Sequence, residues 1–170
     1  EDMNRFAQQA GIVSLDSKMN SIYRQLEEIN TALAQAETKL IGAEAVYRQA
    51  QTEGTESLPQ VLNNPVIGQL KQELTKLKSE YENLSVTFQD EYPSVKAVKS
   101  RINSLQEQLQ AEENRVFRAI NNEYETALKQ FEVLKERAET QKQLAMDLND
   151  RATQYKIMER EVETNKGIYQ

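Results

Sequence analysis

Two series of apolar residues, one on each side of residues 90–93, constrain the fold of this 170-residue chain more than any other feature. Within each series the apolar positions alternate steps of four and three, the heptad spacing of a helix that buries a narrow seam against a partner. The first series comprises Leu15, Met19, Ile22, Leu26, Ile29, Leu33, Ala36, Leu40, Ala43, Tyr47, Ala50, Ile67, Leu70, Leu74, Leu77, Tyr81, Leu84 and Phe88. The second comprises Val95, Val98, Ile102, Leu105, Leu109, Val116, Ile120, Tyr124, Ala127, Phe131, Leu134 and Ala138. The pattern predicts an all-α chain that forms a long antiparallel helical hairpin, a coiled coil with an interrupted outgoing arm.

Glycine and asparagine mark the interruption of the outgoing arm. We expect a first helical arm over residues 1–53, with a kink or break at Gly11. Gly54 suits the left-handed position that follows a helix, so residues 54–64 form a connector. Asn64 as N-cap and Pro65 at the first helical position then begin a second helix, residues 65–88.

The sharp turn is expected at residues 89–93. Tyr92 precedes Pro93 and is therefore biased away from the helical conformation, and Asp90 is available as a cap. A returning helix over residues 94–170 completes the hairpin. Because Asp90, Glu91, Tyr92 and Pro93 form the tip, Tyr92 is a candidate partner contact; the alternative is a turn residue that only covers its own helix ends.

The apolar patterns also predict which residues face each other. Near the tip, pairs whose numbers add to about 182, such as Leu77 with Leu105, match apolar with apolar. Beyond the connector, sums near 181 match Tyr47 with Leu134, Leu33 with Leu148 and Ala36 with Ala145. This register predicts one rod with both chain ends at the same end. A compact three-helix bundle, with the second helix folded back on the first, is the sterically allowed alternative.

The returning arm departs from the heptad pattern at one place. Successive steps of four between Glu112 and Tyr124 form a stutter, which locally unwinds a supercoil and falls opposite the connector. Glu112 is either a polar residue that sets the register or a residue exposed at the stutter.

Composition limits the chemistry that the chain can perform. It has no His and no Cys, which removes imidazole bases, thiol nucleophiles and most transition-metal sites, and it has no glycine-rich phosphate loop. We therefore expect no catalytic residue, no metal site and no cofactor. A net charge of -6 argues against nucleic acid or anionic lipid as the main partner. A two-helix seam leaves each side chain half open, so the hairpin is expected to be stabilised by neighbouring copies, that is by self-association, or by anchoring at its base.

Three segments resemble the periplasmic region of bacterial polysaccharide co-polymerases, the chain-length-determinant (Wzz-like) and exopolysaccharide-export proteins. Residues 58–67, Leu-Pro-Gln-Val-Leu-Asn-Asn-Pro-Val-Ile, are similar to the family's Leu-Pro…Asn-Pro-x-Ile lead into a helix. Residues 90–95, Asp-Glu-Tyr-Pro-Ser-Val, resemble its Pro-Glu-His-Pro-x-Val turn between antiparallel helices. Residues 158–169 resemble the Leu-x-Arg-Glu-x-x-(Ser/Thr)-x-x-x-x-Tyr signature that precedes the second membrane helix, with Arg160, Glu161 and Tyr169 at the signature positions.

The resemblance implies a setting and partners. It implies a periplasmic portion of an inner-membrane protein with two membrane helices, which assembles into rings around the path of an exported glycan. The expected partners are further copies of the chain, an outer-membrane polysaccharide export channel, and the glycan or its polymerase. Some members carry a cytoplasmic tyrosine kinase domain, whose motifs are absent from these residues. Tyr92 stands where the family usually has His, so a role tied to that imidazole does not carry over.

Two other classes fit a helical rod. The runner-up is the helical hairpin of a periplasmic adaptor in a secretion or efflux system, which half-lipoyl β segments should flank. A parallel cytoskeletal or scaffold coiled coil would instead need a seam continuous through Gly54, Pro59, Pro65 and Pro93. Because the chain starts at Glu1 and stops at Gln170 within a helical pattern, we interpret it as a piece of a longer protein.

Overall fold

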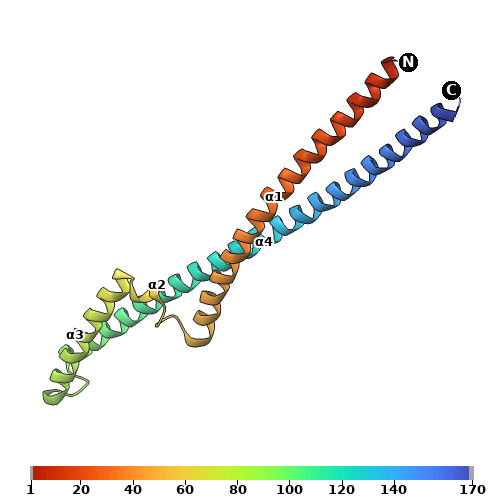
Figure 1. Cartoon of the computed structure of the whole chain (residues 1–170). Helices are drawn as coiled ribbons and strands as arrows, with labels where there is room; N and C mark the ends of the chain where they lie inside the picture. The colour runs from red at the N-terminus through yellow and green to blue at the C-terminus, as the bar shows by residue number, and fades with distance from the viewer. Residues whose placement is uncertain (1, 169–170) are drawn as a thin grey trace. The chain divides into compact units, whose positions relative to one another are not determined.

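The chain is all-α, as the heptad pattern predicts. A computed structural model describes residues 2–168, which form four helices and no strand: α1 (Asp2–Glu53), α2 (Pro59–Leu62), α3 (Pro65–Thr87) and α4 (Pro93–Ile168) (Figure 1). Side chains are described from Gly11 onward, except for a few residues near the two ends.

Helix α1 is continuous through Gly11, so the predicted break there is wrong. A single glycine in a helix interior costs only about 1 kcal/mol relative to alanine. The helix ends where it was expected to end. Gly54 follows it with a φ of 81°, the left-handed conformation that a glycine adopts without a Cβ clash.

The connector contains a short helix, α2, that the sequence pattern did not predict. Pro59 opens it at a first-turn position, and the backbone N–H of Val61 donates to the carbonyl of Leu58. Leu58 and Val61 are each only 1% exposed, so this stretch is packed rather than solvated. The connector therefore folds onto the helices instead of extending along them.

Helix α3 begins as predicted. The Asn64 side chain accepts hydrogen bonds from the backbone N–H groups of Val66 (2.9 Å) and Ile67 (3.2 Å), and Pro65 follows as the first helical residue. The helix ends at Thr87, because Phe88 is extended with φ -121° and ψ 146°.

Contacts divide the structure into two compact units. Unit 1 comprises Glu1–Lys39 and Leu128–Gln170, and unit 2 comprises Leu40–Ala127. Because α1 and α4 each contribute to both units, every unit contains an α1 segment and an α4 segment.

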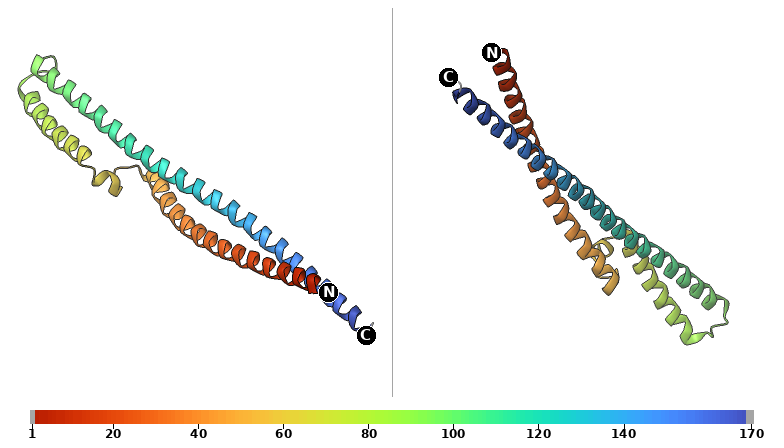
Figure 2. Two further views of the ribbon diagram at one scale, coloured as in Figure 1. Left: turned by 90° about the horizontal axis from the view of Figure 1, so that it is seen from above. Right: turned by 90° about the vertical axis from the view of Figure 1, so that its right-hand side faces the viewer.

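In unit 2, α3 packs on the first part of α4, and the two helices lie side by side in both views of Figure 2. One hydrophobic cluster unites the two helices, and none of its members comes from α1. It contains Leu74, Leu77, Val98, Ile102 and Leu105, with Leu70, Tyr81, Leu84 and Leu109 packed against it. The pairs predicted near the tip, including Leu77 with Leu105, all draw on this set. Helix α3 therefore packs on α4. Both the hairpin and the three-helix bundle contain this contact, so the choice between them stays a prediction.

A second cluster in unit 2 surrounds the connector. Ala50 of α1, Leu58 of the connector and Ile120 of α4 form its buried part. Beside it the ring of Tyr47 stacks on Tyr124 with 4.9 Å between ring centroids and an interplanar angle of 6°. Tyr47 therefore faces Tyr124 and not Leu134, so its predicted pairing is wrong. The predicted stutter region of α4 meets the connector here.

Unit 1 shows a displacement of α1 along α4 in the same direction. The Gln141 side-chain amide donates to Gln25 (2.9 Å), and a Cβ placed on Gly11 would lie 3.7 Å from the Tyr155 hydroxyl. In both pairs the residue numbers add to 166, against the predicted 181. The predicted partners Leu33/Leu148 and Ala36/Ala145 are therefore wrong by about two heptads. A single continuous rod through both units stays a prediction.

Candidate functional site

The turn between α3 and α4, residues 88–92, is the candidate functional site of unit 2. The N–H of Phe88 donates to the carbonyl of Leu84 and closes α3, while the N–H of Tyr92 donates to the carbonyl of Gln89 (both 2.9 Å). The carbonyl of Tyr92 then accepts from the N–H of Lys96 (3.0 Å) and starts α4. Tyr92 therefore occupies the N-cap position and Pro93 the first helical position, where its missing N–H has no cost.

Asp90 and Glu91 fix the turn through their side chains. The Tyr81 hydroxyl donates to one Asp90 oxygen (3.1 Å), and the Lys99 ammonium lies 3.4 Å from the other. Glu91 pairs with Lys96 at 2.6 Å. Asp90 was predicted as a helix cap; its carboxylate instead joins α3 to α4 across the turn. Exposed ion pairs contribute little stability individually, so these contacts give each acidic group of the tip a basic partner without adding much stability.

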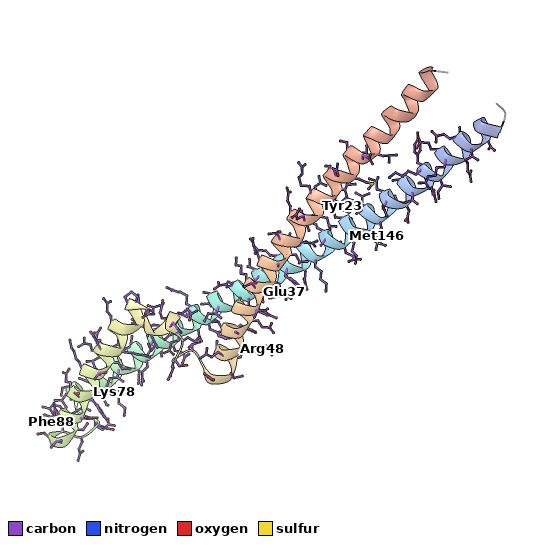
Figure 3. All side chains as sticks on the ribbon, viewed as in Figure 1. Tyr23, Glu37, Arg48, Lys78, Phe88 and Met146 are labelled. Carbon is purple, nitrogen blue, oxygen red and sulfur yellow. The ribbon has the colours of Figure 1, made fainter. Side chains whose placement is uncertain are left out.

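Two aromatic rings are partly exposed at the tip. Phe88 and Tyr92 stack with 4.4 Å between ring centroids and an interplanar angle of 18°, and they are 36% and 49% exposed. Figure 3 labels Phe88 at this turn. Val86, two residues before Phe88 in the sequence, is 87% exposed. An exposed stacked pair gives the tip an apolar surface of the kind that binds a partner.

Sequence reasoning identified Tyr92 but missed Phe88, which was assigned to the seam. The heptad step from Leu84 to Phe88 extends the α3 pattern by one residue beyond the helix end. The signal that could have revealed its role is its position four residues before Tyr92 on the other side of a tight turn. Tyr92 stacks on Phe88 and about half of it remains exposed, so its role as a partner contact or as a turn residue that covers its own helix ends stays open.

Asn64 and Pro65 have a local structural role with one additional contact. While the Asn64 oxygen caps α3, its amide nitrogen lies 3.4 Å from Glu112 on α4. The Glu112 side chain is only 14% exposed and also pairs with Arg115 at 3.1 Å. Glu112 is therefore a half-buried polar contact between the start of α3 and α4, which agrees with the register-setting interpretation.

Arg160 and Glu161 lie in unit 1, on the exposed surface of α4. With Ile157, Thr164 and Asn165 they line a shallow depression on that helix. Tyr169, the last residue of the predicted signature, lies outside the described residues. The structure thus brings the four tip residues together and leaves the Arg160 pair and the Asn64 pair as separate features.

The rest of residues 2–168 was examined for chemistry of other kinds. No group of three or more carboxylates in this part of the chain is arranged to hold a metal ion. No helix within these bounds is long and apolar enough to cross a membrane. The surface with the most distinctive arrangement of side chains is therefore the tip, and its groups are suited to binding.

Comparison with known proteins gives no relative: no family model, no curated protein and no solved structure matches the chain.

Proposed function

We propose that this chain is the periplasmic coiled-coil region of an inner-membrane polysaccharide co-polymerase that takes part in exopolysaccharide or capsule chain-length control and export. In this proposal it acts as an oligomerising spacer directed toward an outer-membrane export channel, and it performs no catalysis itself. The observation that carries the proposal is the tip: a tight turn between antiparallel helices, at the residues that resemble the family's turn, presenting an exposed aromatic pair.

The electrostatics of the tip support a role in contact with a partner. Asp90 and Glu91 are each paired with a lysine within the tip, at 3.4 Å and 2.6 Å. Phe88 and Tyr92 are held against each other, so a partner meets two rings whose positions are already fixed. A preorganised apolar surface loses little conformational entropy when it binds.

The arrangement of α1 and α4 within unit 1 supports the proposed attachment to a membrane. The early part of α1 and the late part of α4 lie beside each other, as the proximity of Gly11 and Tyr155 demonstrates. Both would therefore approach an anchoring surface together, as a protein with a membrane helix on each side of this region requires. The exposed Arg160 and Glu161 would then belong to the segment nearest that surface.

Matched shortening of α3 and α4 tests the spacer role in cells that make the full protein. Deletion of 71–77 together with 105–111 removes one heptad from each helix and keeps the register near the tip. At 1.5 Å per residue, the pair becomes about 10 Å shorter. We expect the yield or the modal length of the exported polysaccharide to change, measured by gel electrophoresis of surface polymer.

The control for this deletion inserts one extra heptad into each helix at the same positions, which conserves the seam and lengthens the pair. If the region is a spacer, both changes should perturb export. If it only connects its two ends and its length does not matter, export should tolerate both changes. Unchanged polymer in both variants, with normal protein levels, would refute the proposed function.

A further inference from the structure

Each helix of unit 1 has a second, exposed apolar surface beside the seam that joins the two helices. On α4, Val133 and Leu144 are 41% and 45% exposed, and their spacing of eleven residues is close to three helical turns. On α1, Tyr23 is 46% exposed and lines a shallow groove together with Ala34, eleven residues later (Figure 3 labels Tyr23). We call Val133 and Leu144 the α4 stripe, and Tyr23 and Ala34 the α1 stripe.

The two stripes lie on opposite sides of the helix pair. The hydrogen bond between the side chains of Gln25 and Gln141 marks one of these sides. Leu144 follows Gln141 by nearly one helical turn, so the α4 stripe is on the side of this bond. Tyr23 precedes Gln25 by two residues, a rotation of about 200° around α1, so the α1 stripe is on the other side. One copy of the chain can therefore not join its own two stripes.

The stripes also lie at the same heights along the pair. Residues of α1 and α4 that meet in unit 1 have numbers that add to 166, so this sum identifies positions at equal height. Tyr23 and Leu144 add to 167, and so do Ala34 and Val133. Each pair is therefore within one residue of equal height, or about 1.5 Å. A second copy placed alongside, with the same direction and no axial shift, brings the α4 stripe of one copy to the α1 stripe of the next.

Charged residues continue the two stripes with opposite signs. Asp16 lies seven residues before Tyr23 and Glu27 four residues after it, on the same face of α1. Arg137 and Arg151 follow residues of the α4 stripe by four and seven positions, and all four charged groups are exposed. Asp16 and Arg151 add to 167, so they too lie at the same height. Arg151 also pairs with the preceding acidic residue of its own helix at 3.0 Å, and its side chain remains 70% exposed.

We propose that the α1 stripe is occupied by the α4 stripe of a second copy of this chain, which lies side by side with the first in the same direction and at the same height. The interface joins two different surfaces, so it is heterologous, and each copy keeps one stripe open for a further copy. The contact repeats the antiparallel α1–α4 pairing of unit 1. The inference rests on the oligomerising role in the proposed function and deepens it by naming the surfaces through which copies meet.

Disulfide formation between copies tests the interface, because the chain contains no cysteine. Two forms of the full chain are made together, one with Tyr23→Cys and one with Leu144→Cys, and the second carries a tag that gives mixed and like dimers different masses. The control replaces Tyr23→Cys by Gln25→Cys, which lies at nearly the same height on the opposite side of α1. Products formed in a glutathione redox buffer are measured by intact mass under non-reducing conditions.

We expect the mixed 23/144 dimer to exceed the 25/144 control about tenfold, because a disulfide requires Cα atoms within roughly 4.4–6.8 Å. It should also exceed the 23/23 and 144/144 dimers. A 23/144 yield at the control level overturns the proposal. An excess of either like dimer overturns it as well, since the interface would then join two identical surfaces.

An exchange of charges tests the direction and height of the contact. Arg151→Glu on the Leu144→Cys copy places two acidic groups together and should lower the mixed yield about threefold. Asp16→Arg on the Tyr23→Cys copy should restore it. The matched control puts each substitution on the other copy, where both lie outside the crosslinked contact, and should leave the yield unchanged. A loss that the exchange does not restore, or an equal loss in the control, contradicts the proposed arrangement.

These outcomes are distinguishable from a failure of the proposed function. If the heptad deletions alter the exported polymer while the 23/144 disulfide stays at the control level, the interface is wrong and the spacer role stands. If the 23/144 disulfide forms while the polymer is unchanged in both length variants, the interface is correct and the spacer role is refuted.

Discussion

The α3–α4 pair and the α1–α4 pair have the same heptad spacing of apolar residues. Only for the α3–α4 pair does this pattern determine the register. The α3–α4 pair is closed by a turn of five residues, 88–92, so the chain itself dictates which residues meet. The α1–α4 pair is separated from that turn by the connector, whose length along the helix axis the pattern does not specify. A heptad seam specifies register only modulo seven residues, and a nearby covalent constraint is needed to select one.

The largest expected effect is all-or-none disulfide crosslinking between engineered cysteines, which tests the register of the α3–α4 helix pair and that of the α1–α4 helix pair. Leu77→Cys with Leu105→Cys should form an intramolecular disulfide, as should Leu33→Cys with Leu134→Cys. Leu33→Cys with Leu148→Cys, the pair that the heptad pattern alone favours, should not form, because its Cα atoms are about two heptads apart and a disulfide requires roughly 4.4–6.8 Å. Non-reducing electrophoresis of the full chain measures all three. Formation of the 33/148 disulfide in preference to the 33/134 disulfide would show that the heptad pattern determines the α1–α4 register as well.

The next effect concerns how much each seam contributes to stability. Leu77 is 4% exposed within the large cluster of α3 and α4, whereas Leu33 in unit 1 is only half-buried. Leu77→Ala should therefore lower the free energy of unfolding by about 2–4 kcal/mol, and Leu33→Ala by roughly half as much. Urea unfolding followed by circular dichroism provides the values. Equal losses at the two positions would show that the α1–α4 seam of unit 1 is packed as tightly as the α3–α4 seam.

A smaller effect is expected at the start of α3, where a cap and an interhelix contact share one side chain. Asn64→Ala removes the acceptor for the Val66 and Ile67 N–H groups and the amide near Glu112, at a cost of about 1–2 kcal/mol. Asn64→Ser keeps a capping oxygen but lacks the amide, so it should recover most of the loss. If serine and alanine destabilise equally in urea unfolding, the contact with Glu112 outweighs the cap.

Particular residues show how far the sequence could predict this structure. The ends of three helices followed from single residues with strong backbone preferences: Gly54, the Asn64-Pro65 pair and Pro93. Gly11 misled, because one glycine is too weak to end a helix of 52 residues whose flanks favour continuation. Leu58 and Val61 carry no periodic signal, and Leu58 is buried by tertiary contacts with Ala50 and Ile120. The wrong prediction of the α1–α4 register followed from this burial. A connector that folds onto the helices adds no length to the outgoing arm, whereas the predicted register counted its residues as part of that arm.

The residues of the candidate site also divide into those that the sequence predicted and those that it did not. Tyr92 and Pro93 were predictable, since an aromatic residue before proline between two heptad series marks an exposed turn. The stacking partner Phe88 was not, because nothing in a helical repeat shows at which residue the helix stops. The bonds of Asp90 to Tyr81 and Lys99 join residues nine positions away on either side, a spacing that becomes meaningful only once the turn has closed.

The smallest expected effect is at those bonds, and it tests whether the tip is preorganised. Tyr81→Phe removes the hydroxyl that donates to Asp90 and keeps the ring in the cluster, so the free energy of unfolding should fall by only about 0.5 kcal/mol. Tyr23→Phe on the exposed surface of α1 is the matched control and should leave stability unchanged. Amide hydrogen exchange at residues 88–92 is the sharper measurement, because loss of one side-chain bond should accelerate exchange in the turn while the helices on both sides stay protected. Unchanged exchange in the turn would mean that the backbone bonds and the Phe88–Tyr92 stack fix the tip without Asp90. The α3–α4 register would then depend on the length of the turn and on the seam alone.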